Sequence, residues 1–248
     1  MKWLALLRSL IATFLFPFTV LILGPTAIAL HFIFHNRRID NQMVMYWGRI
    51  CCWMCGVKVI VTGLENIPQD QGCLLLFNHS SFFDVFAIAG FIRGVRFGAK
   101  SELFKIPIFG KTMAAMGTLP IERKNREEVF KIYDEAKIRF QRGEQFALAP
   151  EGARFYGHDL STFKSGPFQF AMSAGVPVIP TLILGANEAL AKGQILFNPE
   201  RWSHTIYIHI LKPIPTTGFD ANRRQELMKL AYEQMNPIWV ADFEKTKP

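Results

Sequence analysis

A histidine and an aspartate lie five residues apart in residues 78–84 (Asn-His-Ser-Ser-Phe-Phe-Asp). This segment follows residues 73–77, an apolar run that predicts a buried strand, and α/β proteins place their sites beyond the ends of such strands. With His79 in the loop and Asp84 at the third position of the next helix, the carboxylate can fold back onto the imidazole. One ring nitrogen would be held, and the other would be free to accept a proton. The pair therefore predicts a general base, with a substrate hydroxyl as the nucleophile.

The same residues also permit a purely structural interpretation. Ser81 and Asp84 have the spacing of a capping box, in which two side chains bond backbone N–H groups at the start of a helix. His79 would then only precede the cap. The heptapeptide by itself favours neither interpretation.

Three further blocks follow in order along the chain. They are residues 117–123 (Gly-Thr-Leu-Pro-Ile-Glu-Arg), 150–154 (Pro-Glu-Gly-Ala-Arg) and 176–180 (Val-Pro-Val-Ile-Pro). Together with the His79 and Asp84 block, they resemble the four ordered motifs of the glycerolipid acyltransferase superfamily. The chain is most similar to the bacterial 1-acyl-sn-glycerol-3-phosphate acyltransferases of the PlsC type, and the resemblance covers residues 57–211. One block is a weak signal, but four in order at family-like spacing are specific.

The resemblance implies a membrane-bound O-acyltransferase of phospholipid biosynthesis. It would move a fatty acyl chain from a thioester donor, either acyl-CoA or acyl carrier protein, to the free hydroxyl of lysophosphatidic acid, giving phosphatidic acid. His79 would be the general base and Asp84 would orient it, without an acyl-enzyme. Backbone N–H groups at the helix start beyond Ser80 would stabilise the developing negative charge. No cofactor is expected besides the acyl donor.

The resemblance also implies which residues bind the acceptor. Arg123 and Arg154 would bind its phosphate, because guanidinium groups bind phosphate bidentately. Lys100, at the end of another predicted strand, would be a further phosphate ligand. Glu151 and Gly152 would shape their loop and contact the glycerol or hold the arginines.

Two departures from the family pattern keep alternatives open. Ala153 replaces the usual Thr, so a hydroxyl contact is missing, and the acceptor could be another lysolipid, such as a lysophospholipid or a lyso-ornithine lipid. Pro120 alters how Arg123 is presented. An alternative of a different class is a non-catalytic protein that binds anionic lipid through a basic face.

The elements that must position these residues alternate along the chain. Short apolar runs predict strands at residues 57–61, 73–77, 95–99, 118–121, 146–149, 176–184 and 205–211. Helices are predicted at residues 127–142, capped by Asn125, and at 167–174 and 220–243. This alternation predicts an α/β domain over residues 57–248, with a mixed, largely parallel sheet flanked by helices.

Residues 1–56 form a separate apolar part. Residues 9–36 contain no Asp, Glu, Lys or Arg, and about 20 apolar residues suffice to span a bilayer. Because Gly24-Pro25 is a strong turn signal, we expect two helices, 3–23 and 26–34, in a membrane-anchoring hairpin that dips into one leaflet. Positive charge flanks both ends, which places both on the cytoplasmic side; in a bacterium this is the inner membrane's cytoplasmic face. A single span and a signal peptide are the alternatives, and another helix is predicted at 41–56.

The composition is typical of a protein that lies at a membrane surface, and it excludes other classes of protein. Of 248 residues, 50% are hydrophobic and the net charge is +8, which excludes an intrinsically disordered chain. The 23 Phe are unexpected in a nucleic-acid binder, so no nucleic-acid partner is predicted. Residues 93–142 hold twelve Lys and Arg against six Asp and Glu. This basic segment would attract anionic membrane lipids, the acceptor phosphate or an acidic acyl donor.

The four cysteines are Cys51, Cys52, Cys55 and Cys73. Cys52 and Cys55 have the spacing of a zinc-binding pair, but no second pair completes a site. We therefore predict buried, reduced thiols and no metal.

Overall fold

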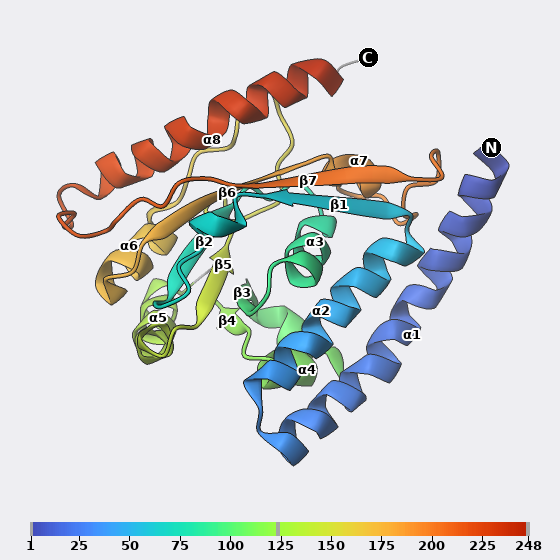
Figure 1. Ribbon diagram of the computed structural model, residues 1–248, viewed down its shortest axis with the longest axis horizontal. Coiled ribbons are helices and arrows are strands. Elements are labelled where there is room, and N and C mark those ends of the chain that lie inside the picture. Colours follow the sequence, from blue (N-terminus) through green and yellow to red (C-terminus); the bar gives the residue numbers. More distant parts are fainter. Residues whose placement is uncertain (1, 123–124, 247–248) are drawn as a thin grey trace.

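The computed structural model describes residues 2–122 and 125–246, which form a sheet between two layers of helices (Figure 1). The sheet has seven strands in the spatial order β1-β7-β6-β2-β5-β3-β4. In chain order they are β1 (Val57–Thr62), β2 (Cys73–Phe77), β3 (Val95–Lys100), β4 (Leu119–Ile121), β5 (Gln145–Leu148), β6 (Val178–Leu184) and β7 (His204–Ile210). Within the described residues, β6 and β7 pair antiparallel and the other neighbours pair parallel. The predicted mixed, largely parallel sheet is confirmed.

Helices cover both faces of the sheet. They are α1 (Lys2–Phe34), α2 (Arg37–Met54), α3 (Phe83–Phe91), α4 (Phe109–Ala115), α5 (Arg126–Gln141), α6 (Ser165–Ala174), α7 (Ala186–Ala189) and α8 (Arg224–Thr246), with short 3₁₀ turns at Leu64–Asn66 and Ser101–Lys105. The predicted cap of α5 is confirmed, because the Asn125 side chain accepts hydrogen bonds from the N–H groups of Glu127 and Glu128.

Two apolar clusters hold the layers together, one on each face of the sheet. Successive strand residues point to opposite faces, so Leu75 of β2 joins a cluster with α2 and α3, whereas Leu74 and Leu76 join one with α5, α6 and α8. All of β2 is buried. Because β2 lies between β6 and β5 in the middle of the sheet, the loop that follows it begins from a rigid position.

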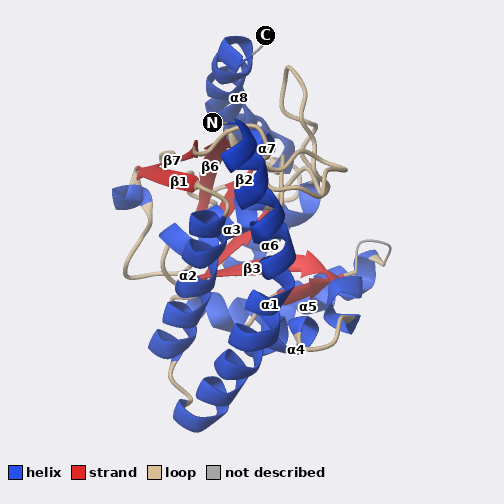
Figure 2. Cartoon of the chain, turned by 90° about the vertical axis from the view of Figure 1, so that its right-hand side faces the viewer, coloured by secondary structure: helices blue, strands red, loops and turns tan. Residues whose placement is uncertain are grey.

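The expected break at Gly24-Pro25 is wrong, because α1 runs unbroken through Pro17 and Pro25. The physical reason is packing against α4. A Cβ at Gly24 would lie 2.8 Å from the Thr112 Oγ1 of α4, so the glycine serves a close approach between helices rather than a turn. The hairpin is instead formed by α1 and α2 around residues 35–36 (Figure 2). Tertiary contacts here override the local turn signal.

The N-terminal helices pack onto the α/β part of the chain. Arg8 of α1 donates hydrogen bonds to the carbonyls of Asn198, at 2.9 Å, and of Trp202. Cys51 and Cys52 of α2 belong to the same apolar cluster as β1 and β2. The division into residues 1–56 and 57–248 stays a prediction.

One helix in the described part, α1, is long and apolar enough to cross a membrane. In its most apolar 18-residue window only 11% of the residues are buried. The exposed side chains include Trp3, Phe14, Ile22, Phe32 and Ile33.

The cysteines are buried, as predicted, and none of the four is bonded to another. Burial raises the pKa of the Cys52 and Cys55 thiols to about 12. Such thiols are poor nucleophiles at neutral pH, because the thiolate is the reactive form.

Candidate active site

Five of the predicted site residues, Gly152 among them, meet at the carboxyl edge of two neighbouring strands. His79 and Asp84 follow β2, and Glu151 and Arg154 follow β5, which pairs parallel with β2. Parallel neighbours end at the same edge of a sheet, so the two loops are brought side by side. The Phe155 N–H donates to the His79 carbonyl at 2.7 Å, which fastens the loop of Arg154 to that of His79.

Asp84 binds the imidazole of His79 directly. The His79 Nδ1 lies 2.8 Å from the Asp84 Oδ2. A carboxylate can only accept here, so Nδ1 carries the proton and Nε2 has a free lone pair. The Asp84 side chain is fully buried, whereas that of His79 is 16% exposed. The expected pairing is confirmed as a geometry, and it leaves a basic nitrogen that a substrate can reach.

The structural and chemical interpretations of Asp84 both apply. Its Oδ2 also accepts hydrogen bonds from the N–H groups of Ser80 and Ser81, each at 2.8 Å. Ser81 Oγ in turn accepts from the N–H of Phe83 at 3.2 Å. The capping interactions at the start of α3 therefore fix the carboxylate that orients His79.

The same interactions limit one expectation, namely that backbone N–H groups at the helix start stabilise an oxyanion. The N–H groups of Ser80, Ser81 and Phe83 are taken by the Asp84 and Ser81 side chains, and those of Asp84 and Val85 by the carbonyls of Ser81 and Phe82. These five amides are therefore engaged within the cap; the N–H of Phe82 is not among them. A short cap that satisfies its own amides leaves fewer donors for a substrate.

Sequence reasoning assigned no role to Asn78, which is a positioning residue. Its side-chain amide donates to the Ile183 carbonyl of β6 at 2.9 Å, and its Oδ1 accepts from the Ile183 N–H at 2.6 Å. The two hydrogen bonds continue the β2–β6 pairing by one residue and hold the backbone just before His79. A polar side chain directly after a buried strand was the available signal.

Glu151 is buried beside His79. Its carboxylate accepts the His79 backbone N–H, and it is 6% exposed. Burial raises its pKa to about 8, the N–H of His79 opposes this, and the charge of Asp84 adds to it. A pKa near 8 favours the protonated form at neutral pH, which argues against holding the arginines by charge. The contact of Glu151 with the glycerol stays a prediction. Gly152 follows with φ +74°, a conformation that favours glycine.

The other predicted cations differ in placement. The Arg154 guanidinium lies over the Phe82 ring, 4.2 Å from its centroid, so it is held beside the start of α3. Lys100 ends β3, two strands from β2 at the same edge, and its Nζ pairs with Glu102 at 2.8 Å. Arg123 lies outside the described residues. Sequence reasoning assigned no role to Lys164, because nothing in its local sequence sets it apart. Its Nζ lies against Gly152.

The buried carboxyl of Glu151 predicts a pH-dependent stability. Below about pH 4.5 it is protonated in both states; above that, only the unfolded chain ionises until the folded pKa near 8 is reached. The contribution of Glu151 to the free energy of unfolding should therefore fall between about pH 4.5 and pH 8, and Glu151→Gln should remove this contribution. Across that pH range, we expect the free energy of unfolding of the variant to rise by on the order of 3 kcal/mol relative to that of the parent.

Thermal unfolding in detergent at pH 5 and pH 8 measures the effect. Glu200→Gln, at an exposed glutamate, is the matched control and should follow the parent. A Glu151→Gln variant whose stability difference from the parent is equal at both pH values would contradict the prediction.

Known proteins resemble this chain in the same region. Residues 58–184 match the sequence model of a family described as Acyltransferase. The 1-acyl-sn-glycerol-3-phosphate acyltransferase of Haemophilus influenzae is 29% identical over 82% of this chain and 82% of its own length. A chloroplastic protein of that name from Brassica napus is 28% identical over 64% of this chain, but this chain spans only 46% of its length.

A solved structure shares the whole architecture. The crystal structure of the 1-acyl-sn-glycerophosphate (LPA) acyltransferase PlsC from Thermotoga maritima matches with a TM-score of 0.79 and 26% identity. The match covers 100% of this chain and 99% of that one. It therefore includes α1 and α2 as well as the segments that carry His79 and Glu151.

Proposed function

This chain belongs to the acyltransferase family, and we propose that it transfers a fatty acyl chain from a thioester donor to the free hydroxyl of lysophosphatidic acid, giving phosphatidic acid. The observation that carries the proposal is the 2.8 Å contact between His79 Nδ1 and Asp84 Oδ2, which leaves Nε2 as a base. The names of the relatives in Haemophilus influenzae and Thermotoga maritima support the same acceptor.

The proposed reaction balances without an acyl-enzyme. Nε2 of His79 takes the proton of the acceptor hydroxyl while the hydroxyl oxygen attacks the thioester carbonyl carbon. Asp84, already bonded to Nδ1, stabilises the imidazolium that forms. A C–O bond forms and the C–S bond breaks. The leaving thiolate takes the proton back from Nε2, which restores the neutral imidazole.

The acceptor phosphate is assigned to the cations at this edge of the sheet. Arg154 supports this role by its place over the Phe82 ring, next to the loop of His79. Lys100 and Arg123 are assigned as further phosphate ligands. To bind the phosphate, Lys100 would have to give up its ion pair with Glu102. That pair is exposed and therefore contributes little energy.

Removing the Arg154 guanidinium should raise the KM for lysophosphatidic acid. A charge-assisted hydrogen bond contributes about 1.5–3 kcal/mol, so Arg154→Ala should raise KM roughly tenfold to a hundredfold with a smaller change in kcat. Initial rates over a range of acceptor concentrations measure both. Arg223→Ala removes an exposed arginine that pairs with Glu226 beside α8 and is the matched control. An unchanged KM in Arg154→Ala would indicate another head group.

Another lysolipid is the second candidate acceptor, and Ala153 is the observation that favours it, because the family's hydroxyl is absent there. A panel of acceptors, each assayed with labelled acyl-CoA and with acyl carrier protein as the donor, separates the candidates. Preference for lysophosphatidic acid supports the first. Preference for an acceptor without a phosphomonoester would support the second.

We also propose that α1 anchors the enzyme by lying in one leaflet, at the cytoplasmic face of the inner membrane if the source is bacterial. The exposed apolar side chains of α1 support this. Anionic lipids would be attracted by the basic segment of residues 93–142.

A further inference from the structure

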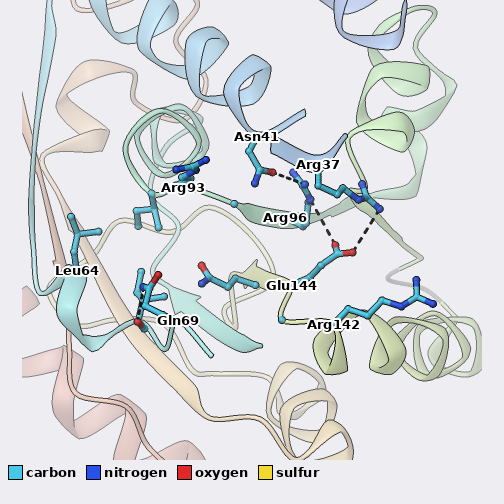
Figure 3. A pocket seen from close by; sticks show the side chains of 13 residues that line it. Arg37, Asn41, Leu64, Gln69, Arg93, Arg96, Arg142 and Glu144 are labelled. Atoms are coloured by element: carbon cyan, nitrogen blue, oxygen red, sulfur yellow. Dashed lines mark hydrogen bonds and ion pairs between the residues drawn. The ribbon is translucent and has the colours of Figure 1, made fainter. Parts of the chain in front are cut away.

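A cavity of about 590 Å³, whose lining side chains are drawn in Figure 3, opens at the amino edge of the sheet. Its lining includes Glu144 and Gln145, at the start of β5. Cys73 of β2 pairs with Gln145, and His79 lies six residues further along, so roughly 20 Å separates the cavity from His79 at about 3.3 Å per residue. The candidate active site thus does not account for this cavity.

Four arginines and one carboxylate line the cavity, which gives it a surplus of positive charge. Arg37, Arg93, Arg96 and Arg142 come from three separate parts of the chain. Glu144 is shared, lying 3.7 Å from Arg37, 3.8 Å from Arg96 and 2.6 Å from Arg139 outside the lining. Arg37 also lies 3.6 Å from the Oδ2 of Asp40. Two carboxylates cannot neutralise the five guanidinium groups of Arg37, Arg93, Arg96, Arg139 and Arg142, and Arg93 and Arg142 make no ion pair with the described residues.

Arg96 is held in the cavity wall with bonding capacity to spare. It is only 4% exposed, and its Nη2 donates to Asn41 Oδ1 at 2.6 Å. Its Nε is buried and has no hydrogen-bond partner in the described part of the chain. Burial lowers its pKa to about 10, which still leaves it charged at pH 7. The Nε faces Glu144 Oε2 at 3.8 Å, which is too long for a hydrogen bond. An anion in the cavity would complete the bonding of this buried, loosely paired guanidinium.

We propose that this cavity is a second anion site, which binds the phosphate group of a phosphate ester independently of the candidate active site. Guanidinium groups match phosphate geometry bidentately. The volume admits more than a bare phosphate, and Leu64, Ile67 and Ile92 give the cavity an apolar side for the rest of the ester.

Two sources could supply this phosphate, the head group of an anionic phospholipid or a soluble phosphate ester. Arg37 begins α2 only three residues after Phe34, and Phe32, Ile33 and Phe34 are 62%, 68% and 56% exposed. These exposed apolar residues are suited to lipid contact, so the position of Arg37 favours the lipid head group. Basic pockets beside membrane helices bind such head groups.

A fluorophore at the cavity rim can report occupancy without any signal from the active site. Leu64 is 46% exposed, whereas the native cysteines are at most 2% exposed, so a Leu64→Cys variant can be labelled selectively. Labelled protein in detergent is titrated with inorganic phosphate, glycerol 3-phosphate, dihexanoyl phosphatidic acid and zwitterionic dihexanoyl phosphatidylcholine. A label at Leu230→Cys on α8 is the control for non-specific effects.

We expect a saturable response to phosphatidic acid at the Leu64→Cys label, and none to phosphatidylcholine. The double variant that combines Arg93→Ala with Arg142→Ala should bind phosphatidic acid at least about tenfold more weakly. Both residues are exposed, so folding should be retained, and Arg223→Ala with Lys229→Ala is the charge-matched control. A response that glycerol 3-phosphate reproduces supports the site and identifies a soluble ester as its source. If no phosphate compound gives a saturable response, or both double variants bind equally, the proposal is wrong.

Discussion

Replacing His79 by alanine should lower kcat for acyl transfer by about three orders of magnitude while leaving the fold intact. The Nε2 of His79 is the proposed proton acceptor, and a positioned general base contributes about 10²–10⁴-fold to a rate. The side chain is 16% exposed and its loop is held by backbone and Asn78 contacts, so its removal costs little stability. Initial rates with lysophosphatidic acid and labelled acyl-CoA measure the effect.

The chain offers a close control for this experiment. His158 and Asp159 also form a pair, with 2.7 Å between Nδ1 and Oδ2, but both side chains are about half exposed. His158→Ala should keep the parental rate. Thermal unfolding and membrane association of both variants should match the parent. If His79→Ala transferred acyl groups at the parental rate, His79 would not be the base. If neither variant nor parent transferred acyl groups, the non-catalytic lipid-binding interpretation would be supported.

Replacing Asp84 by asparagine should lower kcat by about a hundredfold or more. If the amide oxygen takes the place of Oδ2, it can still accept from Ser80, Ser81 and His79, but the negative charge that stabilises the imidazolium is gone. The new NH₂ would then lie at Oδ1, which is buried and has no hydrogen-bond partner among the described residues. An unsatisfied buried donor costs about 1–3 kcal/mol, so stability should fall as well.

Rates and stability must therefore be measured together. Ser81→Ala removes the hydroxyl that bonds Phe83 N and the Leu190 carbonyl, so it weakens the same loop without touching the carboxylate. At an equal loss of thermal stability, Asp84→Asn should lose far more activity than Ser81→Ala. Equal losses of activity would mean that Asp84 acts only as a structural cap.

Regular elements could be predicted closely from local patterns. The run at residues 73–77 coincides with β2, and Asn125 caps α5 as its spacing indicated. These features depend on nearest neighbours and on period-two or period-3.6 hydrophobicity, which the sequence displays directly. The break at Gly24 failed for the opposite reason, because Thr112, 88 residues away in the chain, accounts for the glycine.

The sequence by itself determined the family of this protein, through four ordered motifs, and placed a His and an Asp five residues apart at a strand end. Tertiary structure alone decided which neighbouring groups act with them. Pairing of β2 with β5 brought Glu151 to the backbone of His79, where burial raises its pKa. The cap of α3 engaged five of the amides at the helix start. Side chains at the start of α2 gathered the arginines of the second cavity, because Asn41 accepts from Arg96 and Arg37 pairs with Glu144. Side-chain chemistry is a local property, whereas burial and the sharing of partners depend on residues that are distant in the chain.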